Sequence, residues 1–234
     1  CSYIYTSGTT GRPKAVMVSH DNIVYLARTV KKHLEDDTVF GSRGQERVIS
    51  YLPLSHVAGM MIDIIMPLVS TANNAAGFTT ICFARPYDLK IGTIGDRLRA
   101  IQPSMFLGVP RVWEKMQDKI MEMSKKTPQT GFKLKIKDWA KASALHNAKN
   151  SQLGGTGEYP PNQCCGLLGH DFFDKKVLSM VAGKLGLDQC VFMGTAAAPI
   201  KQSTVDFFAQ IGIELCEIYG MSESTGATTF SSPR

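Results

Sequence analysis

The sequence predicts an α/β protein in which mostly parallel sheets are flanked by helices. Short apolar runs alternate along the chain with longer segments whose apolar residues follow helical spacing. This alternation is typical of parallel strands joined by helices that cover both faces of a sheet. With 234 residues, of which 44% are hydrophobic and 20% charged, the chain has the composition of one globular domain or part of a larger one.

Local signals place the individual elements. Ser19 and the polar residues after it supply a helix N-cap, and apolar residues then follow helical spacing to Leu34. Pro110 at a first helical position opens a later helix. We expect strands at residues 3–5, 15–18, 47–52, 79–84, 104–108, 213–218 and 227–230, a short apolar run at 190–193, and helices at 19–34, 60–70, 88–100, from 110 onward, 172–185 and 201–210.

A glycine- and hydroxyl-rich stretch separates the first two strands: Tyr5-Thr6-Ser7-Gly8-Thr9-Thr10-Gly11-Arg12-Pro13-Lys14. Its glycines let backbone N–H groups turn inward, and its hydroxyls and the Lys14 ammonium add donors and positive charge. The usual P-loop needs Gly before the lysine and Ser or Thr after it, whereas Pro13 and Ala15 stand there. We interpret the stretch as a different phosphate loop, the alternative being a surface turn between strands.

Three further motifs follow predicted strands or the apolar run. They are Tyr51-Leu52-Pro53-Leu54-Ser55-His56-Val57-Ala58-Gly59, Gly194-Thr195-Ala196-Ala197-Ala198-Pro199-Ile200 and Tyr219-Gly220-Met221-Ser222-Glu223-Ser224-Thr225-Gly226. Small residues in the second leave room for a flat group such as adenine. In the third, Tyr219 offers an aromatic face and Glu223 a carboxylate of the kind that binds Mg²⁺. Ligands of parallel sheets gather at the carboxyl ends of strands, so we expect all four motifs to meet there.

In order and spelling, the four motifs resemble the signature of the adenylate-forming superfamily, which contains acyl-CoA synthetases, luciferases and peptide-synthetase adenylation domains. The segment Val109-Pro110-Arg111-Val112-Trp113-Glu114-Lys115 is similar to long-chain fatty acyl-CoA synthetases, and the Gly-Thr-Ala-Ala-Ala-Pro-Ile form to their bubblegum branch. The resemblance runs nearly end to end. It implies that residues 1–234 form part of the family's large N-terminal domain, which binds ATP and the acyl group.

The resemblance also implies roles for single residues. Lys14 is expected to bind the phosphates of ATP together with Thr6, Ser7, Gly8, Thr9, Thr10 and Gly11. The backbone of Ala198 and Pro199 is expected along the adenine, and Gly194 near the acyl pocket. Tyr219 is expected to stack on the adenine, with Glu217, Gly220 and Met221 beside it. Ser222 stands where the family usually has a Thr that contacts the α-phosphate, and Glu223 is expected to coordinate Mg²⁺.

His56 is expected beside the acyl carboxylate and the path of the incoming thiol, with no proton transfer assigned to it. We count it with Lys14, Ser222 and Glu223 as a catalytic residue. The implied reaction is activation of a fatty acid by ATP to acyl-AMP, followed by transfer to coenzyme A as co-substrate. Bringing two anions together requires positioning and charge neutralisation, which the lysine, the loop amides and Mg²⁺ would supply.

The family's ribose-binding Asp, its hinge and the Lys of its C-terminal domain lie beyond a point corresponding to Arg234. We therefore expect the chain to be a fragment, cut at both ends, that lacks the C-terminal domain and full activity on its own. Two alternatives stay open: a nucleotide-binding or structural fragment without catalysis, and an adenylating enzyme that delivers the acyl group to an acceptor other than coenzyme A.

Residues 115–166 differ from the rest of the chain. Nine lysines and three acidic residues lie between 115 and 150, a difference of +6 that equals the formal charge of the whole chain. Such a basic helical segment is compatible with peripheral contact with an anionic membrane, the alternative being a solvated helical face. Residues 154–166, rich in Gly and Pro, predict a mobile loop.

The six cysteines are scattered and favour a reducing compartment. We therefore expect a cytoplasmic protein, peripheral on intracellular membranes if the basic segment binds there, and no nucleic-acid partner. No apolar run is long enough to span a bilayer. Zinc binding by Cys164, Cys165, His170 and Cys190 fails on spacing.

Two further patterns have competing interpretations. Residues 220–224 nearly spell the Gly-x-Ser-x-Gly elbow of serine hydrolases, but the fifth residue is Ser224 and no helical pattern follows. The apolar residues of 60–69, with Met105-Phe106-Leu107, would suit the wall of a long alkyl channel, because Met side chains adapt to a flexible chain. The alternative, favoured for most of them, is that they form the core between sheet and helix.

Overall fold

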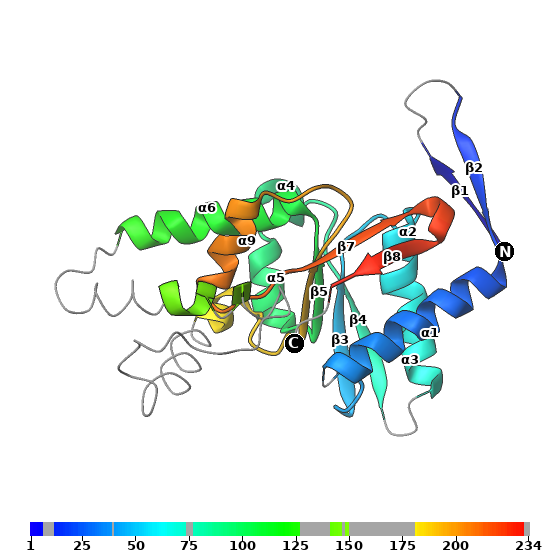
Figure 1. The fold of residues 1–234 in the computed structure, drawn as a ribbon, viewed down its shortest axis with the longest axis horizontal. Helices are drawn as coiled ribbons and strands as arrows, with labels where there is room; N and C mark the ends of the chain where they lie inside the picture. The colour runs from blue at the N-terminus through cyan, green and yellow to red at the C-terminus, as the bar shows by residue number, and fades with distance from the viewer. Residues whose placement is uncertain are drawn as a thin grey trace.

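The computed structural model describes residues 1–6, 12–38, 40–73, 77–126, 141–146, 148–149 and 181–231. Within them, one sheet has the strand order β4-β3-β5-β6-β7-β8, and β1 and β2 form a separate hairpin (Figure 1). The strands are β1 Ser2–Thr6, β2 Lys14–Val18, β3 Gln45–Ser50, β4 Phe78–Phe83, β5 Met105–Gly108, β6 Phe192–Thr195, β7 Cys216–Met221 and β8 Gly226–Phe230.

The pairing within the large sheet is parallel from β4 through β3, β5 and β6 to β7. Only the pairing of β8 with β7 is antiparallel among the described strands of this sheet. This confirms the predicted mostly parallel α/β fold. Strand β7 begins at Cys216, later than predicted, because the apolar residues Ile213 and Leu215 before it are buried without joining the ladder.

Helix α1, His20–Asp37, begins at the predicted cap. Ser19 Oγ accepts a hydrogen bond from the Asn22 backbone N–H at 3.1 Å, and Asn22 Oδ1 accepts one from the Ser19 backbone N–H at 3.1 Å. This reciprocal capping box satisfies two backbone donors that the first turn would otherwise leave unpaired. The helix continues three residues beyond the predicted end at Leu34.

The apolar helix predicted at 60–70 is interrupted by a π-helical segment. It consists of α2 Val57–Gly59, the π-helix η1 Met60–Ile65 and α3 Met66–Asn73. At its end the Met66 backbone N–H donates to Met61 O, one residue further back than in an α-helix. Pro67 explains the wider turn, because a proline inside a helix lacks the N–H and its ring clashes with the carbonyl four residues earlier.

The prediction of a single helix at 88–100 is wrong. The chain forms two helices, α4 Asp88–Ile91 and α5 Ile94–Ile101, separated at Gly92, whose φ of 77° is left-handed. The buried Asp88 carboxylate holds the corner. It accepts hydrogen bonds from the Arg85 side chain at 2.9 Å, Thr93 Oγ1 at 2.5 Å and Arg97 Nε at 3.2 Å. The hydrogen bonds from Arg85 keep the pKa of Asp88 well below its usual value.

Helices α6, Pro110–Lys126, and α9, Gln202–Ala209, confirm two further predictions. Residues 181–185 are helical, as expected for the end of the predicted 172–185 helix, while 172–180 lie outside the described residues. So do residues 127–140 of the basic segment and the predicted loop at 154–166. None of the helices in the described ranges is long and apolar enough to cross a bilayer.

The core lies on both faces of the large sheet, because successive side chains of a strand point to opposite faces. Val48 and Met105 pack with α1 and α3 residues such as Leu34 and Met66. Their neighbours Ile49 and Phe106 pack with α5, α6 and α9. Figure 1 shows α1 and α3 beside β3 and β4, with α5, α6 and α9 on the other side of the molecule. The two layers of helices therefore cover a two-sided apolar sheet, as the sequence predicts.

Candidate active site

The motifs that follow β3, β6 and β7 lie along one edge of the large sheet. These strands are parallel, so the ends at Ser50, Thr195 and Met221 face the same way. The expectation that these three motifs meet at the carboxyl ends of strands is confirmed. It is wrong for the first motif, whose strands form an antiparallel hairpin in a sheet of their own. A short loop can join antiparallel neighbours, whereas parallel strands need a longer crossover.

The hairpin holds the two ends of the predicted phosphate loop opposite each other. Thr6 and Lys14 are register partners, and Thr6 Oγ1 donates to Lys14 O at 3.4 Å. The Lys14 side chain is exposed. The predicted ligands Ser7, Gly8, Thr9, Thr10 and Gly11 lie outside the described residues. The geometry therefore fixes where the loop begins and ends.

Contacts at the base of the hairpin join the first motif to the last. Strand β2 contacts η2, the 3₁₀ turn Ser222–Ser224 that contains Glu223. Ile4 and Val18 of the hairpin pack with Ile23 of α1 and with Val57, the residue after His56. In Figure 1 the β7–β8 turn reaches toward the base of the hairpin. Segments from opposite ends of the chain thus meet at the base of the hairpin.

The last motif is a tight turn between β7 and β8. Ser224 Oγ accepts a hydrogen bond from the Met221 backbone N–H at 3.3 Å and donates toward Gly226 O at 2.8 Å. A Cβ on Gly220 would lie 2.0 Å from Gly226 O, so only glycine fits there. At the turn, Ser222 is half-buried and Glu223 is exposed. Strand β8 follows, which confirms that no helix continues from the serine-hydrolase-like sequence.

Strand β7 presents two predicted nucleotide-binding side chains. Tyr219 is 60% exposed, which leaves its ring available for stacking. Glu217 is exposed and pairs in register with Thr195 at the end of β6. Thr195 Oγ1 is buried and has no hydrogen-bond partner in the part of the chain that the structure describes. The only sequence signal for this hydroxyl is its place in the motif directly after Gly194.

The third motif is held against the core at Gly194. Its carbonyl accepts a hydrogen bond from Trp113 Nε1 at 3.2 Å, and a Cβ here would lie 2.8 Å from the Phe192 ring. Ala197 has a φ of 76°, an unusual conformation for a residue with a side chain. Such strain persists only where the surroundings impose it and is frequent at ligand sites. Ala198 and Pro199 are exposed beside it, as an adenine-facing backbone requires.

His56 caps helix α2 and is exposed. Its Nδ1 accepts a hydrogen bond from the Ala58 backbone N–H at 3.2 Å, so the neutral ring carries its proton on Nε2. Gly59 is required by the turn, because a Cβ would lie 2.3 Å from Pro53 O. The segment packs on the last motif: a Cβ on Gly226 would lie 3.7 Å from Met61 and 3.9 Å from Val57.

A buried acid lies in the π-helix that follows the His56 segment along the chain. Asp63 of η1 is 3% exposed, and its Oδ2 accepts a hydrogen bond from Ser50 Oγ at 2.8 Å. Burial raises the pKa of Asp63 to about 6. The next residue, Tyr51, donates its hydroxyl to Leu107 O at 2.6 Å and accepts from the Val109 backbone N–H at 3.3 Å. The sequence showed Asp63 only as an interruption of an apolar helix.

The residues considered for an alkyl channel are divided. Met61 and Met66 belong to the buried core, and Met105, Phe106 and Leu107 are buried within the sheet. In contrast, Ile64 is 38% and Leu68 63% exposed. The buried methionines and the residues of β5 therefore belong to the core between sheet and helices, as the alternative to the alkyl channel predicts.

The family model for AMP-binding enzymes matches residues 1–234. The long-chain-fatty-acid–CoA ligase ACSBG2 of Gallus gallus is 41% identical over 235 residues, and its counterpart in Xenopus laevis is 42% identical. Each match covers 100% of this chain, but only 28% and 29% of those proteins. The fold and its motifs define a member of the adenylate-forming class. The chain belongs to the AMP-binding enzyme family.

Solved structures of the same class share the fold at low sequence identity. The N-terminal domain of FACL13 from Mycobacterium tuberculosis superposes with a TM-score of 0.55 at 17% identity, over 98% of this chain and 39% of that one. The o-succinylbenzoate CoA synthetase MenE of Bacillus subtilis, solved with ATP and magnesium, gives 0.53 at 15% identity, over 99% of this chain and 32% of that one. These likenesses support the fold described above.

We predict that Asp63→Asn changes how stability depends on pH. The native pKa of about 6 lies above the usual 3.8, so the native state favours the protonated acid. Its contribution is complete below the usual pKa and is lost as the pH rises through 6. Between about pH 5 and pH 7.5, the free energy of unfolding of the native sequence should therefore fall by about 1 kcal/mol more than that of Asp63→Asn.

Urea unfolding across this range measures the difference. The exposed carboxylate of Asp118 provides the control, because Asp118→Asn should retain the native pH dependence. Parallel pH curves for Asp63→Asn and the native sequence would contradict the prediction.

Proposed function

We propose that this chain supplies the ATP- and acyl-binding part of a long-chain fatty acid–CoA ligase. The enzyme would join a fatty acid to AMP, release pyrophosphate and pass the acyl group to the thiol of coenzyme A. One observation carries the proposal: the contact between β2 and η2 brings the phosphate-loop strand to the turn that contains Ser222 and Glu223. The identity of about 40% to ACSBG2 over the whole chain supports the choice of substrate.

The first step brings a carboxylate to the α-phosphorus of ATP, so two anions must approach in line. Lys14, exposed at the start of β2, would neutralise the leaving pyrophosphate. Ser222 at the neighbouring turn would donate to the α-phosphate. The chain needs no nucleophile of its own for this chemistry, because positioning and charge stabilisation lower the barrier.

The turn also fits a divalent cation. Glu223 is an exposed carboxylate, and Mg²⁺ usually takes one or two carboxylates together with phosphate oxygens. A bound Mg²⁺ would spread the negative charge of the phosphates. Strand β2, which begins at Lys14, contacts η2, which contains Glu223, and we propose that the carboxylate and the ammonium act on the same phosphate chain.

The nucleoside and the acyl group would lie along the sheet edge. Tyr219 would stack on the adenine, with the backbone of Ala198 and Pro199 against its edge and Glu217, Gly220 and Met221 beside it. His56 would stand next to the acyl carboxylate, with its Nε2 proton available as a donor. Gly194 would lie near the acyl pocket, and its lack of a Cβ leaves room for the side chains of Phe192 and Leu107.

Peripheral membrane contact is a further part of the proposal. The last turns of α6 have Met121 at 43% and Met123 at 50% exposure, together with lysines of the basic segment 115–150. Exposed apolar side chains among cations favour the surface of an anionic bilayer. A cytoplasmic enzyme at such a surface would meet long-chain acids where they partition.

A chimera tests the function. In it, this chain replaces the matching segment of the Gallus gallus ACSBG2 protein. We expect ATP–pyrophosphate exchange that depends on palmitate and is much weaker with acetate, since each buried CH₂ contributes about 0.8 kcal/mol. A folded chimera with no exchange would contradict the adenylation proposal. Exchange without acyl-CoA formation would point to another acceptor, and a maximum with acetate would refute the long-chain substrate.

The phosphate loop is tested by Lys14→Ala in the chimera. Removal of the ammonium should lower kcat/KM for ATP by at least about tenfold, the effect of losing roughly 1.4 kcal/mol of charge stabilisation. The exposed Lys90→Ala should leave it unchanged. Circular dichroism checks that both variants keep the fold. A normal kcat/KM for ATP in Lys14→Ala would remove this residue from the phosphate site.

The metal ligand is tested by Glu223→Gln in the same chimera. The amide keeps the shape but loses the charge and a hard oxygen ligand, so half-maximal exchange should require about tenfold or more Mg²⁺. Glu114→Gln on α6 is the matched control. If the magnesium titrations of Glu223→Gln and the unsubstituted chimera coincide, the metal ligand lies elsewhere.

A further inference from the structure

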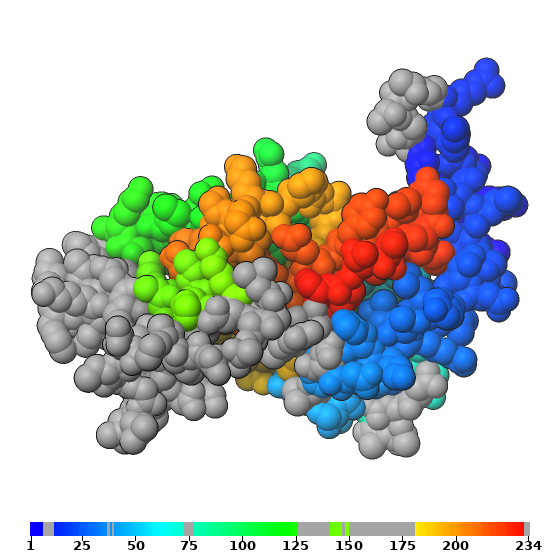
Figure 2. All heavy atoms as spheres, viewed as in Figure 1, coloured from blue at the N-terminus to red at the C-terminus, as the bar shows by residue number. Residues whose placement is uncertain are grey.

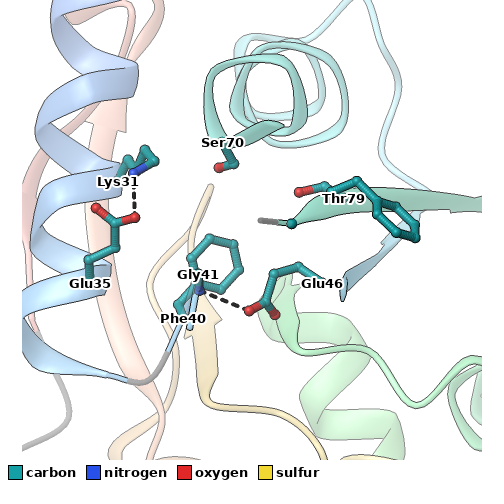
Figure 3. A pocket seen from close by; sticks show the side chains of 9 residues that line it. Lys31, Glu35, Phe40, Gly41, Glu46, Ser70 and Thr79 are labelled. Carbon is teal, nitrogen blue, oxygen red and sulfur yellow. Dashed lines mark hydrogen bonds and ion pairs between the residues drawn. The ribbon is translucent and has the colours of Figure 1, made fainter. Parts of the chain in front are cut away.

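A small cavity lies where α1, β3, α3 and β4 meet, outside the motifs at the sheet edge. Its volume is about 10 Å³, the space of roughly one water-sized sphere. Figure 3 shows Lys31 and Glu35 of α1 on one side and Ser70 of α3 and Thr79 of β4 on the other. Glu46 of β3 lies below them and is hydrogen-bonded to Gly41.

Two polar side chains that line this cavity are buried and unsatisfied. Glu46 is 3% and Ser70 7% exposed. Glu46 Oε1 accepts a hydrogen bond from the Gly41 backbone N–H at 2.8 Å. Within the described residues, Glu46 Oε2 and Ser70 Oγ have no hydrogen-bond partner. Because proteins rarely leave a buried carboxylate oxygen unpaired, the pair indicates a ligand between them.

The charges around the cavity decide what kind of ligand fits. Lys31 forms an ion pair with Glu35, so its charge is already matched. The Glu46 carboxylate is therefore the uncompensated charge of the lining, which totals −1. A water molecule would donate hydrogen bonds and leave this charge in place, whereas a cation would bind the two oxygens and also neutralise the charge. A divalent ion is disfavoured because it seeks more carboxylate ligands and would lie beside Lys31.

We propose that this cavity binds one small monovalent cation, of the size of K⁺ or NH₄⁺, held by Glu46 Oε2 and Ser70 Oγ. Both ions are close to a water molecule in size. The bound cation joins β3, which directly precedes the Tyr51–Gly59 motif, to α3, which follows the motif after η1. The cation therefore stabilises the packing of the two elements, β3 and α3, between which the segment containing His56 lies in the sequence. The proposal is independent of the reaction, since it concerns a structural site away from the nucleotide.

Thermal unfolding in different chloride salts tests the site. At equal ionic strength, the chain is compared in KCl, NH₄Cl, NaCl and choline chloride, choline being too large to enter. We expect the midpoint to rise saturably by about 3 °C in at least one small cation relative to choline. Glu46→Gln and Ser70→Ala should reduce or abolish this rise, and Asp118→Asn, an exposed acid far along α6, should keep it.

A direct measurement keeps the proposal falsifiable if a variant fails to fold. Crystals of the unsubstituted chain grown with Tl⁺ or Rb⁺ should show an anomalous peak within ligand distance of Glu46 and Ser70. Equal midpoints in all four salts would overturn the proposal. So would a feature with the scattering of water and no anomalous signal, which would identify a buried water molecule in place of the cation.

Discussion

The arrangement of the site depends on hydrogen bonds that tie the carboxyl ends of neighbouring strands. The Trp113 indole, fully buried, donates from Nε1 to Gly108 O at 3.1 Å and to Gly194 O at 3.2 Å, which joins β5 to the start of the third motif. The Tyr51 hydroxyl joins the end of β3 to the end of β5. These side chains satisfy carbonyl and amide groups where the ladder stops, so the motifs leave the sheet in fixed directions.

The same constraint explains why glycine recurs at the sheet edge. A Cβ on Gly108 would lie 2.4 Å from Trp113 Nε1, and one on Gly220 would lie 2.0 Å from Gly226 O. These positions require glycine because a neighbouring group, the Trp113 indole at Gly108 and the Gly226 backbone at Gly220, comes too close for a Cβ. Two of the three left-handed non-glycine residues of the described chain, Ala197 and Thr225, lie in the same motifs, and the third, Gln102, ends helix α5.

Most of the large sheet could be predicted from the sequence because its strands are short, apolar and bounded by turn residues. The break at Gly92 was missed because apolar spacing continues through it, and the buried Asp88 that holds the corner has partners that local patterns do not reveal. The residues of the candidate site could be predicted because the sequence motifs contain them. The way these motifs come together could not be predicted, because the contact between β2 and η2 joins residues that only the tertiary fold brings together.

The buried polar groups of this fold are of two kinds: those with a hydrogen-bond partner in the protein and those without one among the described residues. Asp63 accepts a hydrogen bond from Ser50 within the protein, so this buried acid has a partner without a ligand. Thr195 Oγ1 at the sheet edge and Glu46 Oε2 between α1 and α3 have no partner among the described residues. Burying such an atom without a hydrogen-bond partner costs free energy. The proposed ligands would supply these partners: a nucleotide or acyl group for Thr195 at the sheet edge, and a small cation for Glu46 in the cavity.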